Sequence, residues 1–563
     1  MTPEWSTACK DWEQRIVKRE SLIPFPPLFP EEAAASMDVF NSLRIVDVPG
    51  QPTVGESCAP WITEFAQAIF GSLDPETGKR MIREYFLCVS KKNTKSTLAA
   101  AIMLTELIRN ERHSAEFLIL APTIEVANNC YQPARDMVKA DPVLDKLLAT
   151  VDHQRTIKHR ETGATLKVVA ADSNTVSGKK ATGVLVDELW LFGKNAKADA
   201  MLREATGGLV SRPEGFVIFL STQADDSPAG VFKAKLNYYR DVRDGKIDDR
   251  KSLGVLYEFP EAMLEKRDFL KPANFYVTNP NLGVSVSQEW LEDEFRKIAE
   301  AEDGAKQVFL AKHLNVEIGL SLRNDAWAGA RYWADAADPE LVSLDQLLDR
   351  SEVAVIGIDG GGLDDLLGLA VIGRDKTTRD WLLWNHAWAH TDVMTRRGEI
   401  ASLLKDFMRD GDLTLCESPT QDLIEVADIA ERVIAAGLLP ENSGIGVDAV
   451  GIAAIVDELA ARGIGDQQVV AVQQGYRLNG AIAGAERKLK DGTLWHAGQP
   501  LMAWCVGNAK VEMKGSAMSI TKQMAGRAKI DPLAATFNAV MLMALNPEGN
   551  APSVYEDRGM LVL

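Results

Sequence analysis

The sequence predicts an α/β protein with two units, the first built on a doubly wound, mostly parallel sheet. Four apolar runs in the first half read as buried strands that end in polar residues, and helical patterns separate most of them. A second series of strand and helix patterns begins near residue 351. The chain has 563 residues, which is too many for one hydrophobic core.

The composition is that of an ordinary soluble protein, with 46% hydrophobic and 25% charged residues. No apolar run reaches membrane-spanning length and the start lacks a signal peptide's apolar core, so we expect a cytosolic protein without a membrane partner. The six cysteines include no CxxC pair, which argues against a zinc ribbon or a disulfide framework. Because the net charge is −18, any DNA must bind at local basic patches.

The patterns divide the chain into five predicted segments. Residues 1–60 are Pro-rich and read as an irregular N-terminal arm. The others are a first α/β domain at 61–260, a linker region at 261–350, a second α/β domain at 351–548 and a C-terminal tail at 549–563.

A lysine-rich loop, SKKNTKST, lies between the predicted strand Arg83–Val89 and the helix LAAAIMLTELIRN. This order is typical of a phosphate-binding loop, in which backbone N–H groups and a helix N-terminus point at an anion. In such a loop Lys95 reaches the β- and γ-phosphates of a nucleotide, and Ser96 ligates Mg²⁺. The alternative is a lysine-rich loop that merely precedes a surface helix.

The loop departs from the usual G-x-x-x-x-G-K-[ST] pattern, because Val89 and Thr94 stand where the two glycines are expected. A β-branched residue is a poor fit wherever the backbone needs positive φ. Thr94 therefore bears on the loop geometry, and through it on the affinity for ATP and on turnover.

The strand that organises the first unit is Gly183–Val186, and Asp187 and Glu188 follow it directly. Open α/β sheets bind ligands at the carboxyl ends of such central strands. One carboxylate can hold Mg²⁺ near a nucleotide, and the next can orient and deprotonate the attacking water. The alternative is a solvated strand end with no ligand.

A further apolar strand, GFVIFLSTQA, carries Ser221, Thr222 and Gln223 at its carboxyl end. The spacing from Lys95 to Asp187 and on to Ser221 is ordinary for an additional-strand P-loop ATPase, in which a polar strand between the two Walker strands senses the γ-phosphate. The first unit is therefore predicted to be a P-loop ATPase domain.

Three aspartates mark the second unit. Asp359 ends a predicted strand that opens a hairpin or meander, Asp448 ends a later strand, and Asp531 precedes an apolar helix. This order is the plan of an RNase H-like nuclease, whose carboxylates hold two divalent ions about 4 Å apart. Singly, Asp531 before Pro532 could be a helix cap and Asp359 before three glycines a turn residue.

Residues 508–530 carry a local excess of positive charge beside Asp531 in an otherwise acidic chain. Five basic residues stand against one acid there, Glu512. They are Lys510, Lys514, Lys522, Arg527 and Lys529. A surface that tracks DNA phosphates is one interpretation, and a solvated loop is the other.

Over about residues 50–545 these motifs, in order, resemble the large terminase subunit of tailed bacteriophages, the motor that packages DNA into the procapsid. VSKKNTKSTL resembles that family's Walker A segment, ADSNTVSGKKATGVLVDELW the segment into Walker B, and STQA the coupling motif. NPNLG resembles a recurrent linker element. GIDGGGLDDL, GVDAVG, WCVGNAKV and KIDPLAA resemble the nuclease half.

The resemblance implies roles residue by residue. Those implied to bind ATP and its Mg²⁺ are Thr94, Lys95, Ser96, Thr97 and Asp187, with Lys91 or Lys92 as a helper. Glu188 would be the catalytic glutamate, and Ser221, Thr222 and Gln223 would couple hydrolysis to movement. Those implied to hold the nuclease metals, Mg²⁺ or Mn²⁺, are Asp359, Asp448 and Asp531, with Asp365 as an extra ligand. Arg203 and Arg212 are candidates for an arginine finger reaching a neighbouring subunit.

The leading hypothesis is an ATP-driven translocase of double-stranded viral DNA that also cuts concatemers. Its implied partners are the small terminase subunit and the portal protein, on which copies would form a homo-oligomeric ring in the host cytoplasm. One alternative is an ATPase-deficient scaffold that docks on portal and small subunit. Another is a cellular repair helicase–nuclease, which the lack of an evident second motor domain disfavours.

Overall fold

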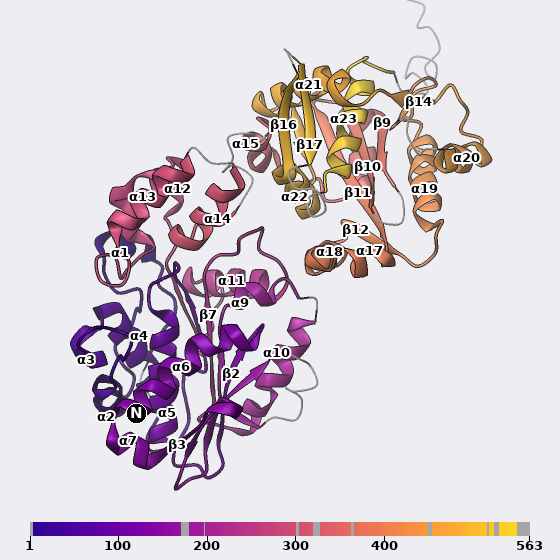
Figure 1. The fold of residues 1–563 in the computed structure, drawn as a ribbon. Coiled ribbons are helices and arrows are strands. Elements are labelled where there is room, and N and C mark those ends of the chain that lie inside the picture. The colour runs from indigo at the N-terminus through magenta and orange to yellow at the C-terminus, as the bar shows by residue number, and fades with distance from the viewer. Residues whose placement is uncertain are drawn as a thin grey trace, which may run out of the picture. The chain divides into compact units, whose positions relative to one another are not determined.

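The chain forms two compact units, Met1–Ile318 and Gly319–Leu563, which Figure 1 draws from indigo to yellow along the sequence. The computed structural model describes residues 4–170, 180–195, 197–299, 303–318, 327–361, 365–448, 453–514, 517–522 and 529–548. The two compact units divide inside the interval 261–350, which the sequence analysis treats as a linker.

The first unit is organised by an eight-stranded sheet with the order β3-β4-β5-β2-β6-β7-β1-β8. The six strands from β5 to β8 in this order run parallel, and β3 and β4 are antiparallel additions at one edge. The strands are β1 (Glu84–Cys88), β2 (Glu116–Ala121), β3 (Leu148–Val151), β4 (Thr156–His159), β5 (Thr165–Ala170), β6 (Ala181–Val186), β7 (Phe216–Ser221) and β8 (Ser252–Leu256). Because β7 lies between β6 and β1, the polar end of β7 faces both neighbouring strand ends, as the sequence predicts.

Helices cover both faces of this sheet. Helices α9, α10 and α11 cover one face, where their residues Leu189, Met201 and Phe232 pack against the strands. Helices α5 and α6 pack together on the other face. The helices of this unit are α1 (Trp12–Lys18), α2 (Pro30–Ser42), α3 (Val54–Ser57), α4 (Pro60–Phe70), α5 (Lys95–Arg109), α6 (Ile124–Ala140), α7 (Pro142–Leu147), α9 (Leu189–Phe192), α10 (Ala198–Gly207), α11 (Gly230–Arg243), α12 (Glu261–Glu265), α13 (Gln288–Ala299) and α14 (Asp303–Leu314). The predicted doubly wound sheet is confirmed.

The prediction that residues 1–60 are irregular is wrong, because α1, α2 and α3 lie there. Two local signals explain these helices. Pro30 stands at the first position of α2, where its fixed φ favours a helix and no donor is lost. Thr53 and Glu56 bond each other's backbone N–H groups in a capping box that starts α3.

The second unit holds a mixed sheet with the order β12-β11-β10-β9-β13-β14, and β15 also pairs with β11. The consecutive strands β9, β10 and β11 form the predicted antiparallel meander, β12 runs parallel to β11, and β13 and β14 run parallel to β9. The strands are β9 (Ser351–Gly360), β10 (Leu366–Asp375), β11 (Trp381–His390), β12 (Leu413–Cys416), β13 (Ile445–Asp448), β14 (Val469–Val472) and β15 (Leu494–His496), with a separate hairpin of β16 (Ala509–Lys514) and β17 (Ala517–Lys522). This is the strand plan expected of an RNase H-like domain.

The long apolar helix α23 (Asp531–Met543) lies across β9, β10 and β13. It approaches closely because glycines face it: a Cβ on Gly357 would lie 1.9 Å from the carbonyl oxygen of Ala535. The other helices of this unit are α15 (Ala330–Trp333), α16 (Leu344–Arg350), α17 (Thr391–Arg396), α18 (Ala401–Asp410), α19 (Gln421–Ala435), α20 (Ala453–Ala461), α21 (Asn479–Lys490) and α22 (Pro500–Asn508). Among the described residues, no helix is both long and apolar enough to span a bilayer.

Candidate functional sites

The loop of residues 89–94 joins β1 to α5, and Lys95 and Ser96 open that helix. The buried Lys95 Nζ lies 3.0 Å from Glu188 Oε1, and Ser96 Oγ donates to Asp187 Oδ2 at 3.4 Å. Asp187 is fully buried and also accepts from Cys130 Sγ at 3.3 Å. The carboxyl end of β6 and the amino end of α5 therefore meet, as the sequence predicts for a nucleotide site.

The two carboxyl groups differ in their acid–base behaviour. Burial raises the pKa of Asp187, and the neighbouring Glu188 charge raises it further, while Lys95 acts in the opposite direction. Burial also opposes ionisation of Glu188, but the charge and hydrogen bond of Lys95, together with the Trp190 hydrogen bond, outweigh it and lower the pKa of Glu188. Glu188 is thus kept as a carboxylate able to accept a proton.

Backbone geometry aims Glu188 across the site. Its φ of 52° is left-handed, which is uncommon outside glycine, and its N–H donates to Asp187 Oδ1 at 2.9 Å. Trp190 Nε1 donates to Glu188 Oε2 at 2.5 Å, which fixes the carboxylate on its other oxygen. A strained residue held by several partners is typical of a functional position.

A cavity of about 480 Å³ opens beside these groups. Its lining includes Lys91, Lys92 and Lys95, a concentration of positive charge suited to a polyphosphate. The remaining lining residues are Ile45, Val46, Asp47, Thr94, Ser96, Thr97, Asn129, Gln132, Pro133, Asp136, Met137 and Glu188. All the loop residues that the sequence implicates in ATP binding therefore border one space within the first unit.

The polar end of β7 connects this site to residues that sequence reasoning missed. Ser221 Oγ accepts from the Trp190 N–H at 3.1 Å, and the Gln223 N–H donates to Asn315 Oδ1 at 2.8 Å. Lys312 Nζ donates to the carbonyl of Gln223 at 2.8 Å and lies over the Trp190 ring. Burial lowers the pKa of Lys312 to about 7. No periodicity or motif in the sequence marks Lys312 or Asn315, because their partners lie far along the chain.

In the second unit the three predicted aspartates converge at one end of the sheet. Val447 of β13 pairs with Ile358 of β9 in parallel register, so Asp448 and Asp359 follow at neighbouring strand ends. Asp448 lies two residues after Gly446, and Asp359 lies two residues after Gly357. A Cβ added to either glycine would lie close to α23. Residues two apart on a strand point to the same face of the sheet. Both aspartates therefore belong to the face that α23 covers.

Asp531 reaches the same place as the first residue of α23, one position after the N-cap residue Ile530. Its Cβ and Oδ1 each lie 3.2 Å from where a Cβ on Gly360 would stand, directly beside Asp359. Asp365 contacts Lys529 in an ion pair. Across the described part of the chain, no three His, Cys, Asp or Glu residues stand close enough together to hold a metal. The carboxylate oxygens are nevertheless the donors that Mg²⁺ and Mn²⁺ prefer.

The remaining predicted residues lie outside these clusters. Arg203 is exposed on α10 and pairs with Asp199 at 2.8 Å. Arg212 precedes β7, at the opposite end of that strand from Ser221. Lys510 lies on the hairpin β16–β17, and Arg527 falls outside the described residues.

Comparison with known proteins decides the family. The terminase large subunit ATPase domain matches residues 60–241, and the terminase large subunit endonuclease domain matches residues 248–547. The chain belongs to the terminase large subunit family. It carries that family's ATPase domain followed by its endonuclease domain, as the motifs imply.

Several known proteins are similar to this chain. The terminase large subunit of Lactococcus phage p2 is 20% identical over 486 residues, which cover 83% of both chains. Protein YmfN of Escherichia coli K12 is 23% identical over 288 residues, and the match spans 48% of this chain and 57% of YmfN. Among solved structures, the HK97 bacteriophage large terminase aligns with 90% of this chain and 99% of its own, at 19% identity and a TM-score of 0.46.

Proposed function

We propose that this terminase large subunit drives double-stranded viral DNA into a procapsid with energy from ATP, and cuts concatemeric DNA when packaging starts and ends. In this proposal residues 61–260 hydrolyse ATP, residues 351–548 cut DNA and residues 261–350 lie between them. The observation that carries it is the pairing of Lys95 with Glu188 and of Ser96 with Asp187 beside a lysine-lined cavity.

At the ATPase site, Lys95 would exchange its contact with Glu188 for the β- and γ-phosphates. Lys91 or Lys92, which line the same cavity, would add positive charge around the phosphates. Glu188, which also accepts a hydrogen bond from Trp190, would orient the attacking water and accept its proton. Ser96 and Asp187 would hold Mg²⁺, which neutralises charge on the phosphates when bound. The polar end of β7, which holds Ser221, Thr222 and Gln223, would couple hydrolysis to movement through its contacts with Trp190 and Lys312.

At the nuclease site, Asp359, Asp448 and Asp531 would hold divalent ions, Mg²⁺ or Mn²⁺. Bound ions of this kind activate water and stabilise the leaving oxygen. Asp365 would serve as an extra ligand if it leaves its pair with Lys529. The basic residues of 508–530 would follow the DNA phosphates, among them Lys510 on the β16–β17 hairpin. Lys529 is the exception, because it is buried and pairs with Asp365.

The partners proposed are double-stranded DNA, the small terminase subunit and the portal protein, in the cytoplasm of the host. Copies would form a ring on the portal, where Arg203 or Arg212 would reach a neighbour's nucleotide. Arg203 is the better placed of the two, because its side chain is 79% exposed.

The test is ATP hydrolysis by the purified protein, measured alone, with DNA, and with DNA plus portal. We expect DNA to stimulate hydrolysis and portal to increase it further, with all activity lost in Lys95→Ala. A wild-type protein that binds portal but hydrolyses no ATP under any of these conditions would favour the scaffold alternative. Equal stimulation with and without portal, together with unwinding of duplex DNA, would favour the helicase–nuclease.

A further inference from the structure

The β1–α5 loop bends through the left-handed region twice without a glycine. Lys92 has a φ of 73° and Thr94 a φ of 56°. Both conformations are disfavoured for side chains with a Cβ, and most strongly for a β-branched residue such as Thr94. Something outside the loop must therefore hold this backbone in place.

A turn at residues 279–285, distant in sequence, bonds each residue at the bend. Ser285 Oγ donates to the carbonyl of Lys92 at 2.7 Å. The Asn281 side chain donates to Thr94 Oγ1 at 2.9 Å and to Ser285 Oγ at 3.1 Å. Both left-handed residues are thus held by this one turn.

The residue between them, Asn93, is fully buried and joined to the same turn. Its Oδ1 accepts from the Asn281 N–H at 3.0 Å, and its Nδ2 donates to Asn279 Oδ1 at 2.9 Å. Asn279 and Asn281 are buried as well. Buried amides with complete partner sets define one arrangement, because losing a partner leaves a desolvated polar group.

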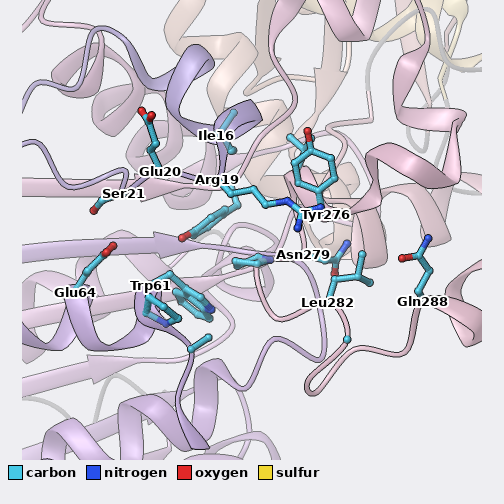
Figure 2. A pocket seen from close by; sticks show the side chains of 16 residues that line it. Ile16, Arg19, Glu20, Ser21, Trp61, Glu64, Tyr276, Asn279, Leu282 and Gln288 are labelled. Carbon is cyan, nitrogen blue, oxygen red and sulfur yellow. The ribbon is translucent and has the colours of Figure 1, made fainter. Parts of the chain in front are cut away.

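The turn is anchored on its other sides by polar contacts too. Trp61 Nε1 donates to Asn281 Oδ1 at 2.8 Å, and Asn279 Nδ2 donates to the carbonyl of His313 at 2.9 Å. A cavity of about 350 Å³ borders the turn, and Figure 2 shows Trp61, Asn279 and Leu282 around it. Since close packing is missing on that side, the hydrogen bonds set where the turn lies.

We propose that residues 279–285 act as a clamp that replaces the missing glycines by holding loop 89–94 in its nucleotide-binding shape. Asn281 and Ser285 are positioning residues in this clamp, since they act on the nucleotide only through the loop. The inference rests on ATP binding at this loop. It also assigns a role in ATP binding to residues within the stretch matched by the endonuclease domain, 248–547, although they lie in the first compact unit.

The test is a double-mutant cycle between the clamp and the strained residue, read out as KM and kcat for ATP hydrolysis and as equilibrium binding of ATPγS. Asn281→Ala loses its bonds to Thr94, Ser285 and Trp61 and should raise KM and the Kd for ATPγS about five- to tenfold, because the loop is then less often in its nucleotide-binding shape. kcat should change little, because the loop holds phosphates in ground and transition states alike.

Glycine adopts a positive φ without strain, so its backbone does not need to be held by the clamp. The double variant Asn281→Ala with Thr94→Gly should therefore regain most of the lost affinity. Loss of affinity in Asn281→Ala with no recovery in the double variant would overturn the clamp, as would unchanged affinity in Asn281→Ala. If Asn281→Ala does not fold, Ser285→Ala decides: its hydroxyl is exposed, and we expect about a two- to fivefold rise in Kd. No rise there would also overturn the proposal.

Asn274→Ala is the matched control, because its amide bonds the Asp268 carbonyl in the same segment at 2.9 Å without contact to the loop. Its Kd should equal that of the wild type, and an equal rise in both variants would contradict a specific clamp. Lys95→Ala separates the two proposals. If that variant binds ATPγS as the wild type does, the nucleotide site itself is wrong, whatever Asn281 does.

Discussion

The two acidic sites of this terminase differ in how the chain brings their charged groups together. In the first unit, Glu188 is paired with Lys95 and Asp187 with the hydroxyl of Ser96, so the acidic pair has a counter-ion within the protein. In the second, Asp359, Asp448 and Asp531 arrive from three elements, and no set of three metal-binding side chains closes up among the described residues.

The difference follows from elementary electrostatics. The opposite charges of Lys95 and Glu188 attract each other, which favours the arrangement of the first site. A bound nucleotide competes with Glu188 for Lys95. The three aspartates of the second site repel one another, so the fold itself must bring them together. It does so where Gly357, Gly368 and Gly446 let α23 approach the sheet. Both sites have a lysine beside a carboxylate, Lys95 with Glu188 and Lys529 with Asp365, so the difference lies in how far the fold itself must hold the acidic groups together.

The strongest way to break this contrast is to remove one carboxylate from the second site. Asp531→Asn keeps the shape but removes a charge that we propose binds metal, so DNA cleavage should fall about 10³-fold or more. ATP hydrolysis by the same preparation should stay at the wild-type rate. The matched control is Asp457→Asn on the exposed side of α20, which should cleave normally. Substantial cleavage by Asp531→Asn in saturating Mg²⁺ or Mn²⁺ would count against a metal role.

Removing the internal counter-ion tests the first site. Lys95→Met leaves the buried Asp187 and the partly exposed Glu188 without their cation, which should destabilise the first unit by about 3–5 kcal/mol and abolish ATPγS binding. Differential scanning calorimetry and equilibrium binding measure the two effects. Lys139→Met, which breaks an exposed 2.8 Å pair with Asp152, should cost no more than about 1 kcal/mol. Equal costs in both variants would show that burial of the Lys95 pair is unimportant.

Lys312, in the first unit, should make the stability of the protein depend on pH. Burial lowers its pKa from the ordinary 10.5 to about 7, and Lys194 and Lys95 add to this while Asp225 and Glu188 oppose it. Between pH 7 and 10.5 the unfolded chain binds more protons at this position, so its contribution to stability rises with pH in that window and is lost as pH falls to 7.

Relative to Lys312→Met, the wild type should therefore gain about 2 kcal/mol between pH 7 and pH 9. Thermal unfolding at the two pH values measures the difference. Lys306→Met on the same helix α14 serves as the control and should show no such change. If the difference in stability between the wild type and Lys312→Met does not grow from pH 7 to pH 9, Lys312 stays charged in the folded protein.

The smallest expected effect concerns the basic hairpin of the second unit. Lys510→Ala should weaken DNA binding a few-fold and lower the slope of log K against log salt by about 1, because one phosphate contact is lost. Fluorescence anisotropy over a salt series measures the slope. An unchanged slope would mean that Lys510 makes no contact with DNA.

Local sequence patterns were enough to predict the strands that carry Asp187, Ser221, Asp359 and Asp448. Each is an apolar run closed by a polar residue, and this signal needs no knowledge of distant contacts. The missing glycine drew attention to Thr94 but left the loop geometry open, and the structure gives Thr94 a φ of 56°.

Contacts between distant segments could not be predicted in this way. Asn281 and Thr94 are 187 residues apart, and Lys312 meets Gln223 across 89 residues. Neither pair leaves a periodicity or a spacing to detect, since only the folded chain brings them together. The helices of residues 1–60 were missed for another reason: their capping signals, at Pro30 and Thr53, lie within Pro-rich sequence that looks irregular.

The central claim is that one chain carries two chemically independent acidic sites. It is tested most directly by measuring ATP hydrolysis and DNA cleavage on the same preparations of Glu188→Gln and Asp359→Asn. We predict that Glu188→Gln loses ATP hydrolysis about 100-fold or more and cleaves DNA normally, and that Asp359→Asn does the reverse. Loss of both activities in either folded variant would contradict two separate sites.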